Sequence, residues 1–181
     1  MKDVRIQTIE TPRLILRPFR EEDAPKMFAN WASDEVVTKF LTWPTHESVE
    51  TTRQIIAQWA SSGSCDWCIE PKEEGEPMGS IGVVHVDPQA ETVEVGYCLA
   101  RKCWGKGYVP EALRALIDWL FREMQPRRIT AKHDLDNPNS GKVMRKAGMT
   151  FLENRSAAVV NHLGLRDVAV YAIDRPEEPS L

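Results

Sequence analysis

The sequence predicts a single domain of mixed α/β class, in which helices flank one mostly antiparallel sheet. Its 181 residues suit one domain with a sizeable core. Stretches with the two-residue alternation of strands are interleaved with stretches that repeat apolar residues at the spacing of one buried helix face. No internal repeat, linker or low-complexity segment divides the chain. We therefore expect one domain over residues 1–175 and a disordered tail over residues 176–181.

The first half of the chain predicts a strand, three helices and three further strands. Leu14 and Leu16 share one face of the first strand, and the acidic residues 21–23 follow at a helix start, where the helix dipole favours negative charge. Gly75 and Pro88 lie in turn segments that separate the later strands. The expected elements are a strand at 11–18, helices at 21–31, 34–41 and 48–60, and strands at 66–70, 78–86 and 91–99.

The second half predicts two helices, a strand between them and a closing hairpin. Asn137 suits a helix cap, Pro138 suits the first helical position and Gly148 suits the helix end. The first of the two helices follows a glycine-rich turn, and its apolar face consists of Ala112, Leu113, Leu116, Ile117, Leu120 and Phe121. The expected elements are a helix ending near Met124, a strand at 127–133, a helix at 137–148, and hairpin strands at 150–159 and 165–172. The sheet should therefore contain about seven strands.

The composition is that of an ordinary soluble globular protein. Hydrophobic residues make up 42%, charged residues 28%, and the formal net charge is −4. The acidic balance argues against nucleic-acid binding and favours a cationic substrate such as an amine. No apolar run is long enough to span a membrane, and residues 1–5 lack the apolar core of a signal peptide, so we expect a cytoplasmic protein.

The four cysteines do not indicate a metal site. Cys65 and Cys68 have the C-x-x-C spacing of redox and zinc sites. The second pair, Cys98 and Cys103, lacks that spacing, and no histidine cluster accompanies either pair. We therefore interpret all four as reduced cysteines and expect no bound metal.

The glycine-rich turn predicts a phosphate site. Gly105 and Gly107 lie where a strand is followed by a helix, and the unpaired N–H groups of a helix start suit a phosphate. The segment lacks the G-x-x-x-x-G-K-[ST] spacing of a P-loop, and Pro110 stands where a dinucleotide fingerprint needs its third glycine. Residues 102–107 instead fit the pattern [QR]-x-x-G-x-[GA], with lysine at the first position.

Further segments accompany this turn in a fixed order. They are Thr11–Arg17 with Asp23-Ala24, Met78–Gly82, Glu94–Tyr97, Trp104–Tyr108 with Glu111–Leu113, Asn137–Ser140 and Lys146–Met149. Together they resemble the GNAT superfamily of acyl-CoA-dependent N-acetyltransferases, and within it the RimJ/RimL-like branch of ribosomal-protein N-terminal acetyltransferases.

The resemblance implies a GNAT-like fold whose central sheet is splayed near its middle to admit acyl-CoA, here acetyl-CoA. The strand at 96–99 should carry a bulge or splay whose free backbone groups bind the pantetheine arm, and amides 102–107 should hold the pyrophosphate. The coenzyme-binding residues implied in this way are Tyr97, Cys98, Leu99, Lys102, Cys103, Trp104, Gly105, Lys106, Gly107, Tyr108, Asn137 and Ser140.

The catalytic residues are predicted less directly. Many members of the superfamily have a tyrosine general acid where this chain has Met144. Glu94 is the leading candidate for the general base, with His85 as the second, although Glu94 also suits a plain ion pair. Tyr97 is a candidate to protonate the leaving thiolate or a packing residue, and Cys98 is a candidate to line the thioester site.

The acceptor is expected to be a primary amine. An α-amine, with a pKa of about 8, is far more often neutral at pH 7 than a lysine side chain at about 10.4. This favours a protein N-terminus, in line with the RimJ/RimL-like resemblance. A small-molecule amine (a polyamine, an aminoglycoside or another metabolite) remains an alternative, as does a non-catalytic acyl-CoA-binding module. The closing hairpin could pair in a homodimer.

Overall fold

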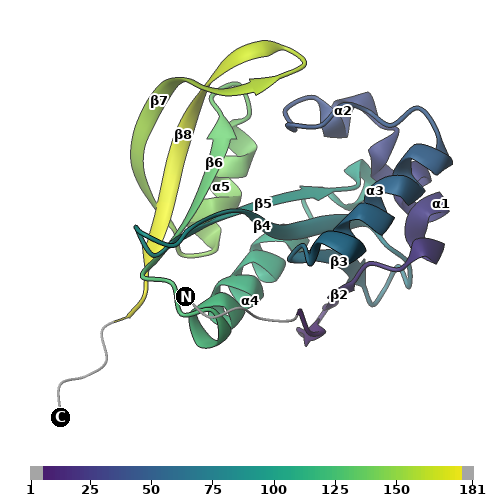
Figure 1. Ribbon diagram of the computed structural model, residues 1–181, viewed down its shortest axis with the longest axis horizontal. Helices are drawn as coiled ribbons and strands as arrows, with labels where there is room; N and C mark the ends of the chain where they lie inside the picture. Colours follow the sequence, from purple (N-terminus) through teal and green to yellow (C-terminus); the bar gives the residue numbers. More distant parts are fainter. Residues whose placement is uncertain (1–5, 177–181) are drawn as a thin grey trace.

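The computed structural model describes residues 6–176, which form an eight-stranded mixed sheet flanked by helices (Figure 1). The strand order is β1-β2-β3-β4-β5-β6-β8-β7. The strands are β1 (Ile9–Glu10), β2 (Leu14–Pro18), β3 (Asp66–Pro71), β4 (Gly79–Asp87), β5 (Thr92–Leu99), β6 (Arg128–Asp134), β7 (Thr150–Asn161) and β8 (Gly164–Asp174). The predicted fold class is confirmed, and all seven predicted strands are present. The eighth, β1, has two residues and leaves no alternation to detect in the sequence.

The helices match the predicted order, with one correction near the start of the chain. They are the 3-10 turn η1 (Glu21–Asp23), α1 (Ala24–Met27), the π turn η2 (Phe28–Ala32), α2 (Glu35–Thr38), α3 (Val49–Ser62), the 3-10 turn η3 (Arg101–Cys103), α4 (Tyr108–Glu123) and α5 (Pro138–Lys146). The single helix predicted at 21–31 is thus three short pieces. Its end is widened because the amide and hydroxyl of Ser33 both donate to the carbonyl of Phe28, five residues earlier.

The expectations for residues 1–5 lie outside the described residues, as does the expected tail from residue 177 onward. Among the described residues, no helix is long and apolar enough to cross a membrane. No group of three or more potential ligating side chains in that part of the chain could hold a metal ion.

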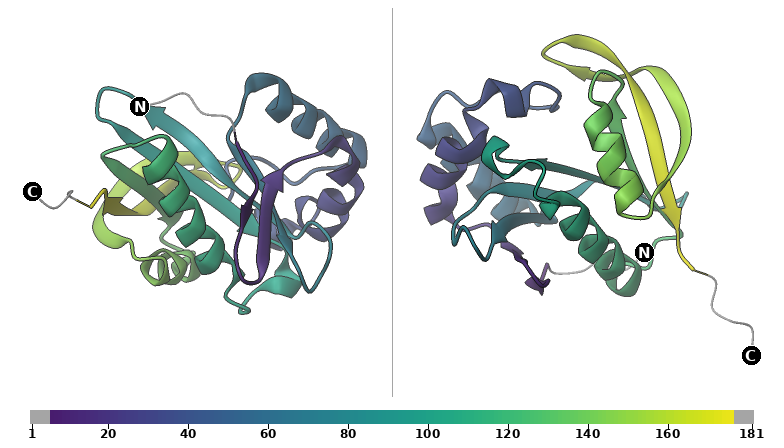
Figure 2. Two further views of the ribbon diagram at one scale, coloured as in Figure 1. Left: turned by 90° about the horizontal axis from the view of Figure 1, so that it is seen from below. Right: turned by 180° about the vertical axis from the view of Figure 1, so that it is seen from behind.

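The helices lie on both faces of the sheet. Trp67 of β3 packs edge-on against Trp119 of α4, with ring centroids 5.0 Å apart. The neighbouring Cys68 is placed against Arg17 of β2 in the register, and Arg17 makes a two-pronged ion pair with Asp23 of η1. Because successive strand residues point to opposite faces, α4 and the N-terminal helical segment cover opposite sides of the sheet (Figure 2).

The sheet opens between β5 and β6. These strands are parallel and pair only at Thr92–Glu94 with Arg128–Thr130, whereas β5 pairs with β4 along its full length. Beyond Glu94, β6 continues alongside β8, and Figure 1 shows β6, β8 and β7 turning away from β4 and β5. The predicted splay is therefore present. The bulge, however, lies in β4, where the register shifts between Val83 and His85.

Candidate active site

The glycine-rich turn connects β5 to α4 and holds two left-handed residues. Gly105 and Gly107 both have φ of +79°, and Gly107 caps the helix that begins at Tyr108. Residues with a Cβ adopt this conformation at a cost, so the two glycines make the turn possible. We call residues 105–109 the amide loop.

The amide loop presents unpaired N–H groups at the start of α4. Upstream, the amides of Cys103 and Trp104 donate to the carbonyls of Ala100 and Arg101. Within the described part of the chain, no acceptor receives the amides of residues 105–109, and Pro110 has no N–H group. Since α4 adds the positive end of its dipole at the same point, this loop is suited to bind an anion.

Two lysines of this region are held by an acidic turn between β3 and β4. The Nζ atom of Lys102 lies 3.2 Å from an Oε1 atom of Glu76, and that of Lys106 lies 2.6 Å from Oε1 of Glu74. The hydrogen bond from Lys106 lowers the pKa of Glu74 below its usual value. The acidic turn thus partly neutralises the positive charge next to the amide loop.

The aromatic and sulfur side chains of this region support the loop. Trp104 is half exposed and donates from Nε1 to the carbonyl of Leu99 at 2.7 Å. Cys103 is fully buried, and Tyr108 is buried with its hydroxyl directed to Glu73 at 3.1 Å. These contacts account for Cys103, Trp104 and Tyr108 as packing residues of the loop.

The edge of β5 that faces the gap carries free peptide groups. The amide of Ala100 donates to the carbonyl of Met78, the residue just before β4, which places the peptide groups of Cys98 on the β4 side by alternation. The carbonyl of Val95 and both peptide groups of Tyr97 then face the opposite edge, beyond Glu94, the last residue of β5 that pairs with β6. An extended ligand in the gap would meet them as the next strand of the sheet.

Tyr97 and Cys98 have defined partners. The Tyr97 hydroxyl crosses to α5 and donates to the carbonyl of Ser140 at 3.1 Å. Burial raises its pKa, so the hydroxyl stays neutral. Cys98 is buried with its Sγ atom 3.2 Å from Oγ of Ser80, and burial raises the pKa of the thiol to about 11.

Glu94 lies at the last paired position before the gap. Its Oε1 atom is 2.9 Å from Nζ of Lys132 on β6. Glu94 therefore forms an ion pair, which is one of the two roles that the sequence suggested for it. His85 is its direct partner on β4 and therefore shares its face of the sheet. Lys132 is distant from Glu94 in the sequence, so no local sequence pattern predicts this ion pair.

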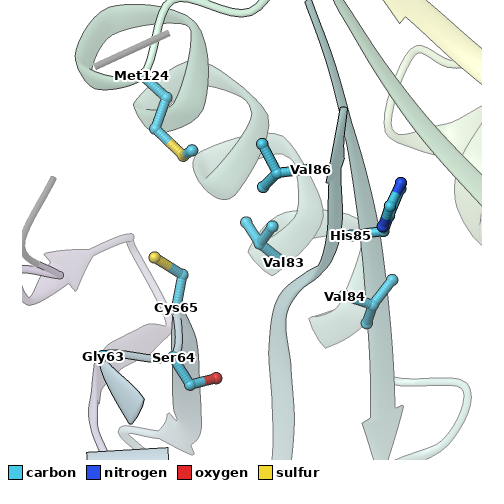
Figure 3. A pocket seen from close by; sticks show the side chains of 8 residues that line it. All are labelled: Gly63, Ser64, Cys65, Val83, Val84, His85, Val86 and Met124. Atoms are coloured by element: carbon cyan, nitrogen blue, oxygen red, sulfur yellow. The ribbon is translucent and has the colours of Figure 1, made fainter. Parts of the chain in front are cut away.

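A shallow pocket of about 340 Å³ lies beside the β4 bulge. It is lined by Gly63, Ser64, Cys65, Val83, Val84, His85, Val86 and Met124. Figure 3 shows Val84 and His85 on one side of β4, with Val83 and Val86 on the other, toward Met124. Two successive side chains on one side are what a bulge produces, and the shift places His85 on the same face of the sheet as its partner Glu94.

The start of α5 differs in one respect from the prediction. Pro138 occupies the first helical position and Gly148 follows the helix with φ of +94°, both as predicted. The predicted capping role of the Asn137 side chain is wrong, because its amide donates toward Oγ of Ser140 at 3.4 Å and accepts no helix N–H. Met144, where many relatives of the superfamily place tyrosine, is buried in the core.

The residues that bind the carbonyl groups of the amide loop were not identified from the sequence. Arg13 donates from Nη1 to the carbonyl of Lys106 at 2.8 Å and from Nη2 to that of Gly107 at 3.2 Å. Its Nε atom is 2.6 Å from Oε2 of Glu111. Arg13 and Glu111 both lie in segments that carried the resemblance, but they are 98 positions apart, and no spacing rule joins them.

The comparison with known protein families decides the assignment. A family model described as an acetyltransferase (GNAT) domain matches residues 13–150. The chain belongs to the GNAT acetyltransferase family. The predicted resemblance is thereby confirmed, and this GNAT chain is an N-acetyltransferase.

Relatives and solved structures agree with the GNAT assignment. An uncharacterized N-acetyltransferase, p20, of Bacillus licheniformis is 34% identical over 143 residues, which cover 77% of this GNAT chain and 80% of p20. The ribosomal-protein-serine acetyltransferase of Escherichia coli is 34% identical over 76 residues, 42% of either chain, in support of the RimJ/RimL-like branch. A GNAT-family acetyltransferase from Bacillus anthracis superposes with a TM-score of 0.83 at 26% identity, covering 93% of this chain and 98% of that one.

Proposed function

We propose that the protein transfers the acetyl group of acetyl-CoA to a primary amine, and that its acceptor is the α-amine of a protein N-terminus. One observation carries the coenzyme part: the unpaired amides of residues 105–109 lie just after the end of β5, whose free edge faces the gap. Coenzyme A has a pyrophosphate that suits the first feature and an amide-bearing arm that suits the second.

Each end of the coenzyme has candidate contacts in this arrangement. The amide loop would hold the pyrophosphate, and the carbonyl of Val95 and the peptide groups of Tyr97 would pair with the pantetheine arm. Asn137 and Ser140 lie across the gap at the start of α5, joined to β5 by the Tyr97 hydroxyl. The lysines Lys102 and Lys106 add positive charge beside the same loop.

Direct attack of the amine on the thioester fits the chemistry of the site better than an acyl-cysteine intermediate. A cysteine nucleophile needs a thiolate, and Cys98 is a neutral, buried thiol whose pKa is raised to about 11. In direct attack, the amine nitrogen bonds to the carbonyl carbon, the oxyanion is stabilised by N–H groups of the β5 edge, and the carbon–sulfur bond then breaks.

Glu94 is the proposed base that takes the proton from the attacking nitrogen, directly or through a water molecule. It lies two residues before Gly96, at the point where the gap begins. Tyr97 is the proposed donor to the leaving thiolate. Its neutral hydroxyl would exchange its hydrogen bond to Ser140 for one to sulfur.

A protein α-amine is the favoured acceptor for a physical reason. With a pKa of about 8 it is roughly a tenth neutral at pH 7, so a site with one carboxylate base can use it. The names of similar proteins agree: one acts on ribosomal-protein serine, and the solved RimL is called an L7/L12 α-N-protein acetyltransferase.

A small-molecule amine is the second candidate, because the same fold serves other purposes. The microcin C7 self-immunity acetyltransferase MccE has a TM-score of 0.81 with this chain at 19% identity, and was solved with acetyl-CoA and AMP. A non-catalytic acyl-CoA-binding module is the third, favoured only by Met144 in place of tyrosine.

The test is thiol release from acetyl-CoA in the presence of N-terminal peptides, polyamines and aminoglycosides. We expect release with peptides whose α-amine is free and none with the same peptides blocked at the N-terminus. Release with only a polyamine or an aminoglycoside would replace the acceptor by the second candidate. If acetyl-CoA raises the melting temperature but no amine releases thiol, the binding module is correct, and if acetyl-CoA does not bind, the whole proposal fails.

A further inference from the structure

The Arg13 side chain donates hydrogen bonds to carbonyl oxygens of the amide loop. The two Nη atoms of Arg13 donate to the carbonyls of Lys106 and Gly107, at 2.8 and 3.2 Å. In a trans peptide the C=O of one residue and the N–H of the next point in opposite directions. The amides of Gly107 and Tyr108 must therefore point away from Arg13, on the side where no acceptor of the described chain receives them.

Arg13 is itself fixed by a dedicated carboxylate. Its Nε and its backbone amide both donate to Glu111, at 2.6 and 2.9 Å, and the Thr11 hydroxyl donates to the same carboxylate at 2.6 Å. Burial alone would raise the pKa of Glu111, but these hydrogen bonds outweigh it and lower the pKa. The guanidinium also lies over the ring of Tyr108, 5.0 Å from its centroid.

The guanidinium is held at three points. One N–H each of Nε, Nη1 and Nη2 donates to a protein oxygen, and these contacts tie the turn between β1 and β2 to the first turn of α4. The loop it holds contains two glycines, which restrict the backbone least of all residues. A ligand that had to order this loop would bind more weakly by the cost of ordering it.

We propose that Arg13 is a positioning residue for the coenzyme: it fixes the carbonyls of Lys106 and Gly107 so that the loop amides are aimed at the pyrophosphate before the coenzyme arrives. The inference rests on the proposed function, because it presupposes that the amide loop binds coenzyme A. Thr11 and Glu111 support the same arrangement by holding Arg13.

The test is calorimetric binding of coenzyme A to the full chain and to its Arg13→Gln and Arg13→Lys variants. Arg13→Gln should weaken binding by about tenfold or more, which corresponds to the loss of one charge-assisted hydrogen bond. Arg13→Lys should lie between, since an ammonium reaches one carbonyl but cannot fork to two. The control is Arg122→Gln at the far end of α4, where the side chain is exposed and, among the described residues, forms an ion pair only with its neighbour Glu123.

Two further measurements separate positioning from general stability. In the free protein, the amide NMR signals of Gly107 and Tyr108 should shift in Arg13→Gln, while those of β7 and β8 stay in place. With an active acceptor, KM for acetyl-CoA should rise and kcat at saturation should stay near that of the wild type. If Arg13→Gln does not fold, Arg13→Lys and Glu111→Gln provide the same comparison.

Each result has a distinct meaning. Unchanged coenzyme affinity in folded Arg13→Gln would overturn the inference and leave the proposed function intact. A fall in kcat equal to the rise in KM would also overturn it, because it would place Arg13 in the chemical step. Failure of the wild-type chain to bind coenzyme A would refute the proposed function, and the inference with it.

Discussion

Replacement of Gly105 by aspartate tests the amide loop most directly. A Cβ atom at Gly105 would meet nothing within 4 Å, so no steric clash accompanies the change. The φ of +79° imposes strain of about 1–2 kcal/mol on any residue with a Cβ. For a chain of this length, each kcal/mol lowers the melting temperature by about 2–4 °C.

The charge of the new carboxylate is the larger effect on binding. Two unit charges 4 Å apart near a protein surface interact by about 4 kcal/mol, and the pyrophosphate would lie within this range of the new side chain. Allowing for screening by salt, we expect Gly105→Asp to weaken coenzyme A binding by at least about 100-fold.

Gly63 provides a matched control for the strain. It follows α3 with φ of +68°, and a Cβ there would also meet nothing within 4 Å. Gly63→Asp should therefore lose similar stability while leaving coenzyme affinity unchanged. Calorimetry and thermal unfolding of both variants measure the two effects separately. Equal affinities in Gly105→Asp and Gly63→Asp would refute the assignment of the amide loop as the pyrophosphate site.

Three more predictions test the remaining parts of the site. Glu94→Gln should lower turnover at least about tenfold with coenzyme binding intact. The control Lys132→Met breaks the same ion pair and should keep most of the turnover. Equal losses of turnover in both variants would make Glu94 only a structural partner. Cys98→Ala should keep turnover and form no covalent acetyl-protein detectable by mass spectrometry. Loss of turnover in a folded Cys98→Ala protein would contradict direct attack. Glu74→Gln should tighten coenzyme A binding about two- to fivefold at low salt, because it frees Lys106 to contact the phosphates. Calorimetry should find a smaller effect at high salt. Unchanged or weaker binding would contradict competition between the acidic turn and the phosphates for Lys106.

Local patterns in the sequence were sufficient for the elements and for the amide loop. The loop could be found because Gly105 and Gly107 encode an unusual backbone conformation within three residues, next to a helix with a clear apolar face. Pro138 and Gly148 could be placed for the same reason, since each is a local requirement of a helix end.

Features that depend on distant partners could not be found in this way. The π turn η2 depends on bonds from Ser33 to Phe28, and Asn137 turns its side chain to Ser140 rather than to a helix amide. The contacts of Arg13 with Glu111 join segments that only the folded sheet brings together. The same holds for the ion pair of Glu94, whose partner lies on a strand beyond the gap.

The opening between β5 and β6 has a consequence for the cooperativity of the fold. Within residues 6–176, three residue pairs of the backbone ladder join the N-terminal strands of the sheet to the C-terminal β6, β8 and β7. The Glu94–Lys132 ion pair and the hydrogen bond from Tyr97 to α5 are further links. A ligand that pairs with Val95 and Tyr97 would extend the interrupted ladder of backbone hydrogen bonds. The two halves would then open together rather than separately, and slower hydrogen exchange in β6 and α5 would report occupancy of a site that lies on β5.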